Sequence, residues 1–527
     1  MAARFLFLTA DFPSGLGAKG VLYTDEGWWS RNAVAWVREG DWHIDDGYNP
    51  IINLPVVSLL QTVWFKAFGV SLSAARSLTA VLSVGVSVLV FLLVRREVKG
   101  HLAWLAPALV LSSFPTFAFS RLALLEMPML FLILVSLWLV PYRARSQSTS
   151  ERNTAERNAT ERNIGERNIG ERNTGSLKQV RGDAYQLRPS VGIVLSALAF
   201  GGAVLTKTTA LFALPISLWL LWVQPRSVWD KLRWLLLWLL TIALLYGLYY
   251  VVFVVGQPSD SEYFTSYNVT GKLVHENAFT FFRGPFRAIR RSLTLFPILL
   301  PCFFASLLIL FQNKAYRASR IFIISALWSV LSLTAFSLSN YAPSRYFTVL
   351  IVPIAMAIPL ALQSVLQGQK GLLAEDDHRN LFIGRGLPFA VVLSVVLSLS
   401  RIGIYLASPA FTFMNMAQSV ASYIEQHPQR TNVVIGHFAD SLALAVPLKG
   451  VNDKMGFQSL AHRLETFNPS YYVFAGSIED TDAIKDFDYR PAAEIKQNYT
   501  FRLIDTFNVY PGRIYQKPVF FYELLPK

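Results

Sequence analysis

Apolar runs separated by short polar loops fill the chain between about residues 73 and 407. A helix needs roughly 20 apolar residues to cross a bilayer. The pattern therefore predicts ten membrane-spanning helices, near residues 73–94, 101–119, 122–142, 190–205, 209–224, 232–254, 291–311, 321–339, 347–366 and 387–407. The fourth and fifth runs are short, which indicates tilted, broken or re-entrant segments.

The first 72 residues contain no complete span. The apolar stretch at 4–12 is too brief to cross a membrane, and no small-residue cleavage site of a signal peptide follows it. Apolar positions recur at helical spacing in residues 23–38 and 51–68, so we predict two amphipathic helices that lie on the membrane surface.

The hydropathy falls after residue 408, and residues 409–527 have the pattern of a small α/β domain. Short β-rich runs near 432–437, 471–475 and 519–524 predict strands, with helical patterns between them. A different segment, residues 143–188, repeats Glu-Arg-Asn every five residues and contains few apolar groups. We interpret this repeat as a disordered, solvated loop on the cytoplasmic side.

Composition narrows the class of protein further. Hydrophobic residues make up 53% of the chain and charged residues 16%, which excludes a soluble or disordered protein. The single cysteine, Cys302, excludes an internal disulfide framework. The expected fold class is therefore mainly α, a polytopic membrane helical bundle over residues 73–408 with a small C-terminal α/β domain.

The net charge of +14 reflects membrane topology rather than nucleic-acid binding, because most lysines and arginines lie in short loops between apolar runs. The basic loops are residues 95–99, 143–188, 225–233, 312–320 and 367–386. Basic loops stay in the cytoplasm. Residues 1–72 and 409–527 are therefore expected on the extracytoplasmic side of a plasma (inner) membrane.

Two acidic sites are candidates for chemistry. Asp25 and Glu26 begin the first amphipathic helix, where an acid can also simply favour the helix dipole. Glu126 lies early in the third predicted span, and a carboxylate at that depth is expensive and indicates function. Its structural alternative is a pair with Arg121, five residues earlier, which is poorly placed on a straight helix.

Three basic residues lie near the outer ends of the predicted spans: Arg76, Lys207 and Arg345. For each of these residues alone, the simpler interpretation is that the long side chain extends along the membrane helix and places its charge at the membrane interface. Together with external carboxylates, they indicate a site where acids activate a hydroxyl and cations neutralise a phosphate leaving group.

Several ordered motifs resemble a known family. They are Asp25-Glu-Gly-Trp28, Tyr48-Asn-Pro50, the run from Phe65 to Arg76, the run from Ser120 to Pro128, Leu205-Thr-Lys207 and Ser344-Arg-Tyr346. In this order they resemble the GT-C fold glycosyltransferases that take sugars from polyprenyl phosphates. The nearest branch is the protein O-mannosyltransferase and lipid A aminoarabinose transferase superfamily (glycosyltransferase family 39-like), over roughly residues 20–365.

The resemblance implies roles for individual residues. Asp25, in the acidic pair with Glu26, corresponds to the catalytic base, and Glu126 to a second acidic position that orients the acceptor or substrate. Lys207 and Arg345, with the neighbouring Tyr346, correspond to positions that hold the lipid-linked phosphate, and Arg76 is a further candidate.

The implied reaction is an inverting displacement that moves a hexose or pentose from a polyprenyl-phosphate donor to a glycan, lipid or protein acceptor. Some relatives use a divalent metal, but the sequence shows no strong ligand cluster, so no metal or other cofactor is predicted.

The chain departs from the family at both ends. Relatives have a membrane helix before the acidic loop, which residues 4–12 are too short to supply, so we expect a truncated start or a remnant of that helix. Residues 409–527 do not match the family pattern, and we expect them to recognise the acceptor.

Two other functions stay open. A transporter or lipid flippase would also place charges along a substrate path, but it predicts inverted repeats, which are not evident. A non-enzymatic receptor that displays the C-terminal domain leaves Glu126 and Lys207 unexplained.

Overall fold

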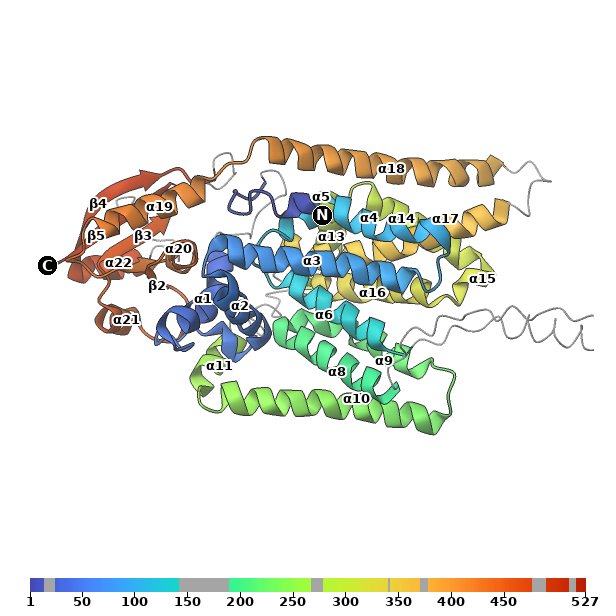
Figure 1. Ribbon diagram of the computed structural model, residues 1–527, viewed down its shortest axis with the longest axis horizontal. Coiled ribbons are helices and arrows are strands. Elements are labelled where there is room, and N and C mark those ends of the chain that lie inside the picture. Colours follow the sequence, from blue (N-terminus) through green and yellow to red (C-terminus); the bar gives the residue numbers. More distant parts are fainter. Residues whose placement is uncertain are drawn as a thin grey trace, which may run out of the picture.

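The computed structural model describes residues 1–13, 24–141, 189–266, 278–339, 342–369, 378–475, 490–510 and 518–527. It shows a bundle of helices that run in a common direction, with a sheet domain and the short helices α1, α2 and α11 at one end (Figure 1). The predicted disordered loop at 143–188 lies outside the described residues.

Six helical segments of the described chain are long and apolar enough to cross a membrane. They are α3 (Leu72–Val94), α8 (Pro189–Thr206), α10 (Val228–Tyr249) with η5 (Tyr250–Val254), α16 (Arg320–Leu338), η7 (Ser344–Leu350) with α17 (Ile351–Gln369), and α18 (His378–Ala407). Ser71, Ser227 and Ser319 cap the N-termini of α3, α10 and α16, where each hydroxyl accepts a backbone N–H hydrogen bond.

The other apolar runs are helical but interrupted. They form η3 (Gly100–Trp104), α4 (Leu105–Ser112), α5 (Phe114–Phe119), α6 (Glu126–Leu139), η4 (Thr208–Ala213), α9 (Leu214–Trp222), α13 (Ala278–Leu295), α14 (Leu299–Gln312) and α15 (Lys314–Arg317). The chain bends by 109° between α13 and α14, where Pro297 cannot donate a helical hydrogen bond. In the described chain, six of the ten predicted spans, or seven if this bent pair forms one span, correspond to helices that are long enough to cross a membrane by length and composition. The other three correspond to the shorter apolar helical segments at Gly100–Ser112, Glu126–Leu139 and Thr208–Trp222.

The two amphipathic helices predicted in the first 72 residues are present as α1 (Thr24–Glu39) and α2 (Pro55–Phe68). Helix η2 (Pro50–Ile52) contacts both α1 and α2, and it also contacts α11 (Pro258–Thr265). The side chain of Arg4, in η1 (Ala2–Arg4), donates to the carbonyl oxygen of Thr116 in α5. Helix α1 is not an exposed surface helix, because it packs between α2 and α20 of the C-terminal domain.

The C-terminal part is an α/β domain, as predicted. Its five-stranded sheet has the order β2-β1-β3-β5-β4, in which β1 is parallel to β2 and β3, while β5 is antiparallel to β3 and β4. The strands are β1 (Val433–Gly436), β2 (Lys449–Val451), β3 (Tyr471–Ala475), β4 (Tyr499–Phe507) and β5 (Val519–Pro526), and the helices are α19 (Thr412–Glu425), α20 (Ala439–Ala445), α21 (Leu460–Phe467) and α22 (Arg490–Asn498).

Strand β3 shows how this domain joins the rest of the molecule. Its alternate residues point to opposite faces of the sheet, as in any strand. Tyr472 belongs to a core within the domain, whereas Tyr471 and Val473 belong to a second core that also contains Ala33 and Val34 of α1. Helix α1 and the sheet therefore share one hydrophobic core.

Candidate active site

The first turn of α1 carries the acidic pair Asp25 and Glu26. Both side chains are buried, and Asp25 is only 6% exposed. The Asp25 carboxylate forms an ion pair of 2.5 Å with the Nη1 of Arg345, which lies in η7. The start of α1 is thus tied to the beginning of a membrane-spanning segment.

Glu126 is the first residue of α6 and is 3% exposed. Its Oε1 lies 2.6 Å from the Nζ of Lys207 and 3.3 Å from the Nε of Arg345. Arg345 therefore bridges the two carboxylates that the sequence singled out. Arg121 does not bind Glu126, because its guanidinium donates to the carbonyl oxygens of Ala3 and Phe7.

Lys207 lies where α8 ends and η4 begins, and it is buried rather than extended to the surface. Its Nζ lies 3.7 Å from the centre of the Tyr346 ring, a cation–π contact. Asp25, Glu126, Lys207, Arg345 and Tyr346 form one group, which we call the acid–cation cluster. The cluster joins α1, α6, η7 and the α8–η4 junction.

Glu26 and Arg76 form a separate pair beside this cluster. The Nε and Nη2 of Arg76 donate to the two carboxylate oxygens of Glu26 at 2.8 and 2.6 Å. Glu26 also accepts the backbone N–H of Ala123 at 2.8 Å, and Arg76 Nη1 donates to the carbonyl oxygens of Leu8 and Ala10. The protein itself thus satisfies these two groups, which attach the first turn of α1 to α3.

The acid–cation cluster contains two carboxylates and two cations, so it is neutral as a whole. Buried charges are tolerated when they are paired in this way. An anionic ligand that enters must compete with Asp25 and Glu126 for Lys207 and Arg345. Within the described ranges, His, Cys, Asp and Glu side chains form no group of three that could hold a metal ion.

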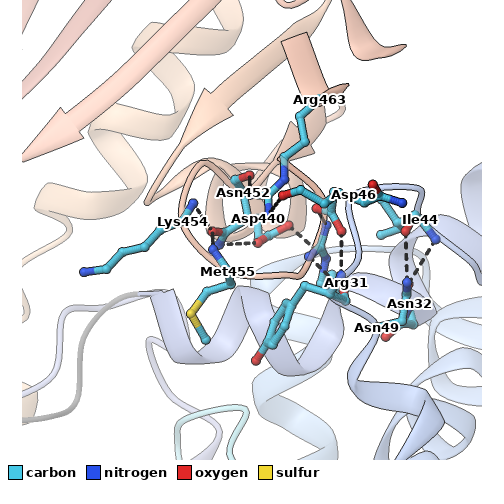
Figure 2. A network of polar contacts seen from close by, with 12 residues as sticks. Arg31, Asn32, Ile44, Asp46, Asn49, Asp440, Asn452, Lys454, Met455 and Arg463 are labelled. Atoms are coloured by element: carbon cyan, nitrogen blue, oxygen red, sulfur yellow. Dashed lines mark hydrogen bonds and ion pairs between the residues drawn. The ribbon is translucent and has the colours of Figure 1, made fainter. Parts of the chain in front are cut away.

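The sequence analysis did not identify a second buried charged network, which lies between α1 and the C-terminal domain. Figure 2 shows Arg31 between Asp46 and Asp440. The sequence does contain a signal for this network. Arg31 lies three residues after Trp28 and four residues before Ala35, so it shares a helix face with these two apolar residues. An arginine on an apolar stripe predicts a buried partner.

Comparisons with known proteins agree with this architecture. Residues 55–157 match the family model of dolichyl-phosphate-mannose-protein mannosyltransferase. No curated protein sequence matches the chain.

Among solved structures, the fold is similar to ArnT from Cupriavidus metallidurans bound to undecaprenyl phosphate. The two chains are 13% identical, with a TM-score of 0.59 over 99% of this chain and 96% of that chain. The apo state of the same protein matches equally well, at 12% identity and a TM-score of 0.59 over the same shares of both chains. The chain is therefore a multi-pass membrane protein of the GT-C glycosyltransferase fold, as its motifs predicted, and it carries in residues 55–157 the pattern of the protein mannosyltransferase family.

Proposed function

We propose that the protein transfers a sugar from a polyprenyl-phosphate donor to a hydroxyl acceptor at the extracytoplasmic face of the membrane. The observation that carries this proposal is the bridge of Arg345 between Asp25 and Glu126, with Lys207 on the second carboxylate. One similar structure binds undecaprenyl phosphate, and the matching family is described as using dolichyl-phosphate-mannose.

In the proposed reaction, Asp25 accepts the proton of the acceptor hydroxyl. The acceptor oxygen forms a bond to the anomeric carbon while the bond from that carbon to the phosphate oxygen breaks. The electron pair leaves with the polyprenyl phosphate, whose charge Lys207 and Arg345 neutralise. A single displacement of this kind inverts the anomeric centre.

The ion pairs suggest how donor binding prepares the base. The guanidinium of Arg345 forms ion pairs with both Asp25 and Glu126. A phosphate that binds Arg345 takes the place of the Asp25 carboxylate on this guanidinium. Asp25 is then released to accept the acceptor proton, while Glu126 keeps Lys207 in position.

The test uses the purified protein in lipid with a panel of labelled hexosyl and pentosyl polyprenyl phosphates. Transfer is expected with at least one donor, and Asp25→Asn should reduce it by about 100-fold or more. Asp45→Asn is the matched control, because this exposed aspartate pairs only with His462 among the described salt bridges.

Undiminished transfer by Asp25→Asn shows that Asp25 is not the base. Movement of the lipid across proteoliposomes without any covalent product would support a flippase instead. The anomeric configuration of the product, measured by NMR, tests the inverting step.

A further inference from the structure

Helix α1 belongs to two parts of the molecule at once. Its first turn contacts the membrane bundle through Asp25 and Glu26, which bind Arg345 and Arg76. Its remaining length packs on α2 and on α20 of the C-terminal domain. The position of the proposed base therefore depends on what holds the rest of α1.

The contact between α1 and α20 brings backbone against backbone. A Cβ atom added to Gly27 would lie 2.3 Å from the backbone nitrogen of Ser441, far inside van der Waals contact. The next residue, Trp28, packs edge-to-face on His437, with 5.4 Å between the ring centres. These contacts are two and three residues from Asp25, so a shift of α20 must move the first turn of α1.

A buried ion network fixes the next turn of the helix (Figure 2). The guanidinium of Arg31 binds the carboxylate of Asp46, donates to the carbonyl oxygen of Tyr48 at 2.9 Å, and lies 3.3 Å from Asp440 Oδ1. Asp440 belongs to α20, and its other oxygen accepts a hydrogen bond of 3.2 Å from Asn452. Arg31 thus links α1, the following loop and the C-terminal domain.

The last turn of α1 is held by the same domain. Arg38 donates to the carbonyl oxygens of Val446 and Leu448, and Glu39 forms an ion pair of 2.6 Å with Lys449. The C-terminal domain therefore contacts α1 near its start, in its middle and at its end.

We propose that the C-terminal domain positions the base of the active site, with Arg31 and Asp440 as positioning residues that act on Asp25 through helix α1. The activity test of this inference rests on the function proposed above. Removal of the Asp440 charge leaves the buried Arg31 with Asp46 as its carboxylate partner, and it weakens the attachment of α1 to α20. Catalysis is sensitive to such shifts, because a displacement of about 1 Å can cost about 100-fold in rate.

The experiment compares full-length Asp440→Asn and Gly27→Ala with the native protein in lipid. The amide introduced by Asp440→Asn keeps an oxygen for the Asn452 side chain but lacks the charge that faces Arg31. Both variants are expected to lower kcat by about 10-fold or more while the KM for the donor changes by less than about twofold. Arg502→Gln is the matched control, because it breaks an ion pair with Glu523 in the same domain, on β4 and β5, away from α1.

Two further readouts separate positioning from stability. In an Asp25→Asn background, Asp440→Asn should cause no additional loss of the residual transfer, because its effect acts through the Asp25 carboxylate. Hydrogen exchange should increase over residues 24–31 in Asp440→Asn and stay unchanged in Arg502→Gln, and this result does not require any enzymatic activity.

The outcomes distinguish this inference from the proposed function. Native protein that transfers sugar, with both variants within about twofold of its kcat, overturns the positioning role. So does a rise in the KM for the acceptor at constant kcat, which instead assigns acceptor binding to the domain. Native protein that fails to transfer any sugar overturns the proposed function, and hydrogen exchange over α1 then still decides whether Asp440 holds the helix.

Discussion

Glu126 shows what a buried carboxylate at the start of a membrane helix requires. It contacts Lys207 at 2.6 Å and Arg345 at 3.3 Å, and it is almost inaccessible to solvent. Glu126→Gln removes the negative charge that faces Lys207 and Arg345 in a buried site. We therefore expect this variant to destabilise the protein by about 3 kcal/mol and to abolish transfer. Thermal unfolding in detergent measures the first effect.

A double variant serves as the control for this prediction. Glu126→Gln combined with Lys207→Met removes one charge of each sign, so part of the lost stability should return while transfer stays absent. Equal melting temperatures of the native protein and Glu126→Gln contradict the interpretation of these groups as a coupled buried pair.

The buried carboxyl of Asp453, in the C-terminal domain, makes the stability of the protein depend on pH. Burial raises the pKa of this carboxyl to about 6 from 3.8, against the opposing hydrogen bond from Tyr472. The folded state therefore binds the proton more tightly than the unfolded chain. The stability that this group contributes is fully present below pH 3.8 and is lost as the pH rises through about 6.

Asp453→Asn should therefore be more stable than the native protein above pH 6, by up to roughly 3 kcal/mol, and equally stable below pH 3.8. Unfolding of both proteins across this range measures the difference. The exposed Asp45→Asn should follow the native curve, and an Asp453→Asn curve parallel to the native one contradicts the assignment.

At the scale of the element, α3 depends on its N-terminal cap. Ser71 has an extended backbone, and its Oγ accepts the N–H of Ala74 at 3.1 Å. Ser71→Ala should cost about 1 kcal/mol, because a backbone donor at the start of α3 loses its partner. Ser71→Asn preserves the cap and should behave like the native protein in thermal unfolding.

The helix α1 illustrates how a correct local prediction gives an incomplete picture of an element. Its periodicity predicted an amphipathic helix on a membrane surface, and the helix is present. Its apolar face instead joins the core of the C-terminal domain through Ala33 and Val34. Periodicity shows that one face of a helix is buried, but it does not identify what covers that face.

At the scale of the whole molecule, the distribution of basic loops predicts the orientation in the membrane. The loops near Lys314 are expected in the cytoplasm, and α1 with the sheet domain on the opposite side. After replacement of the buried Cys302 by alanine, Asp45→Cys should react with an impermeant maleimide in intact cells. Lys314→Cys should react only after permeabilisation, and the reverse labelling pattern contradicts this orientation.

The sequence by itself determined the membrane class, the positions of the helical segments and the identity of the charged candidates. Hydropathy is a sum over neighbouring residues, so apolar runs are visible without any tertiary information. The cost of a charge within such a run also depends mainly on its local surroundings, which is why Glu126 and Lys207 stood out. The motif order around Asp25 and Arg345 added the resemblance to the GT-C fold.

Only the tertiary structure decided which acid meets which cation. Lys207 and Glu126 are 81 positions apart, and Arg345 bridges Asp25 and Glu126 from a third segment. Arg76, which sequence reasoning grouped with the phosphate-binding cations, is paired with Glu26. Such pairings depend on how the helices pack and on the sub-ångström distances of buried charges, and neither quantity is a property of a local stretch of sequence.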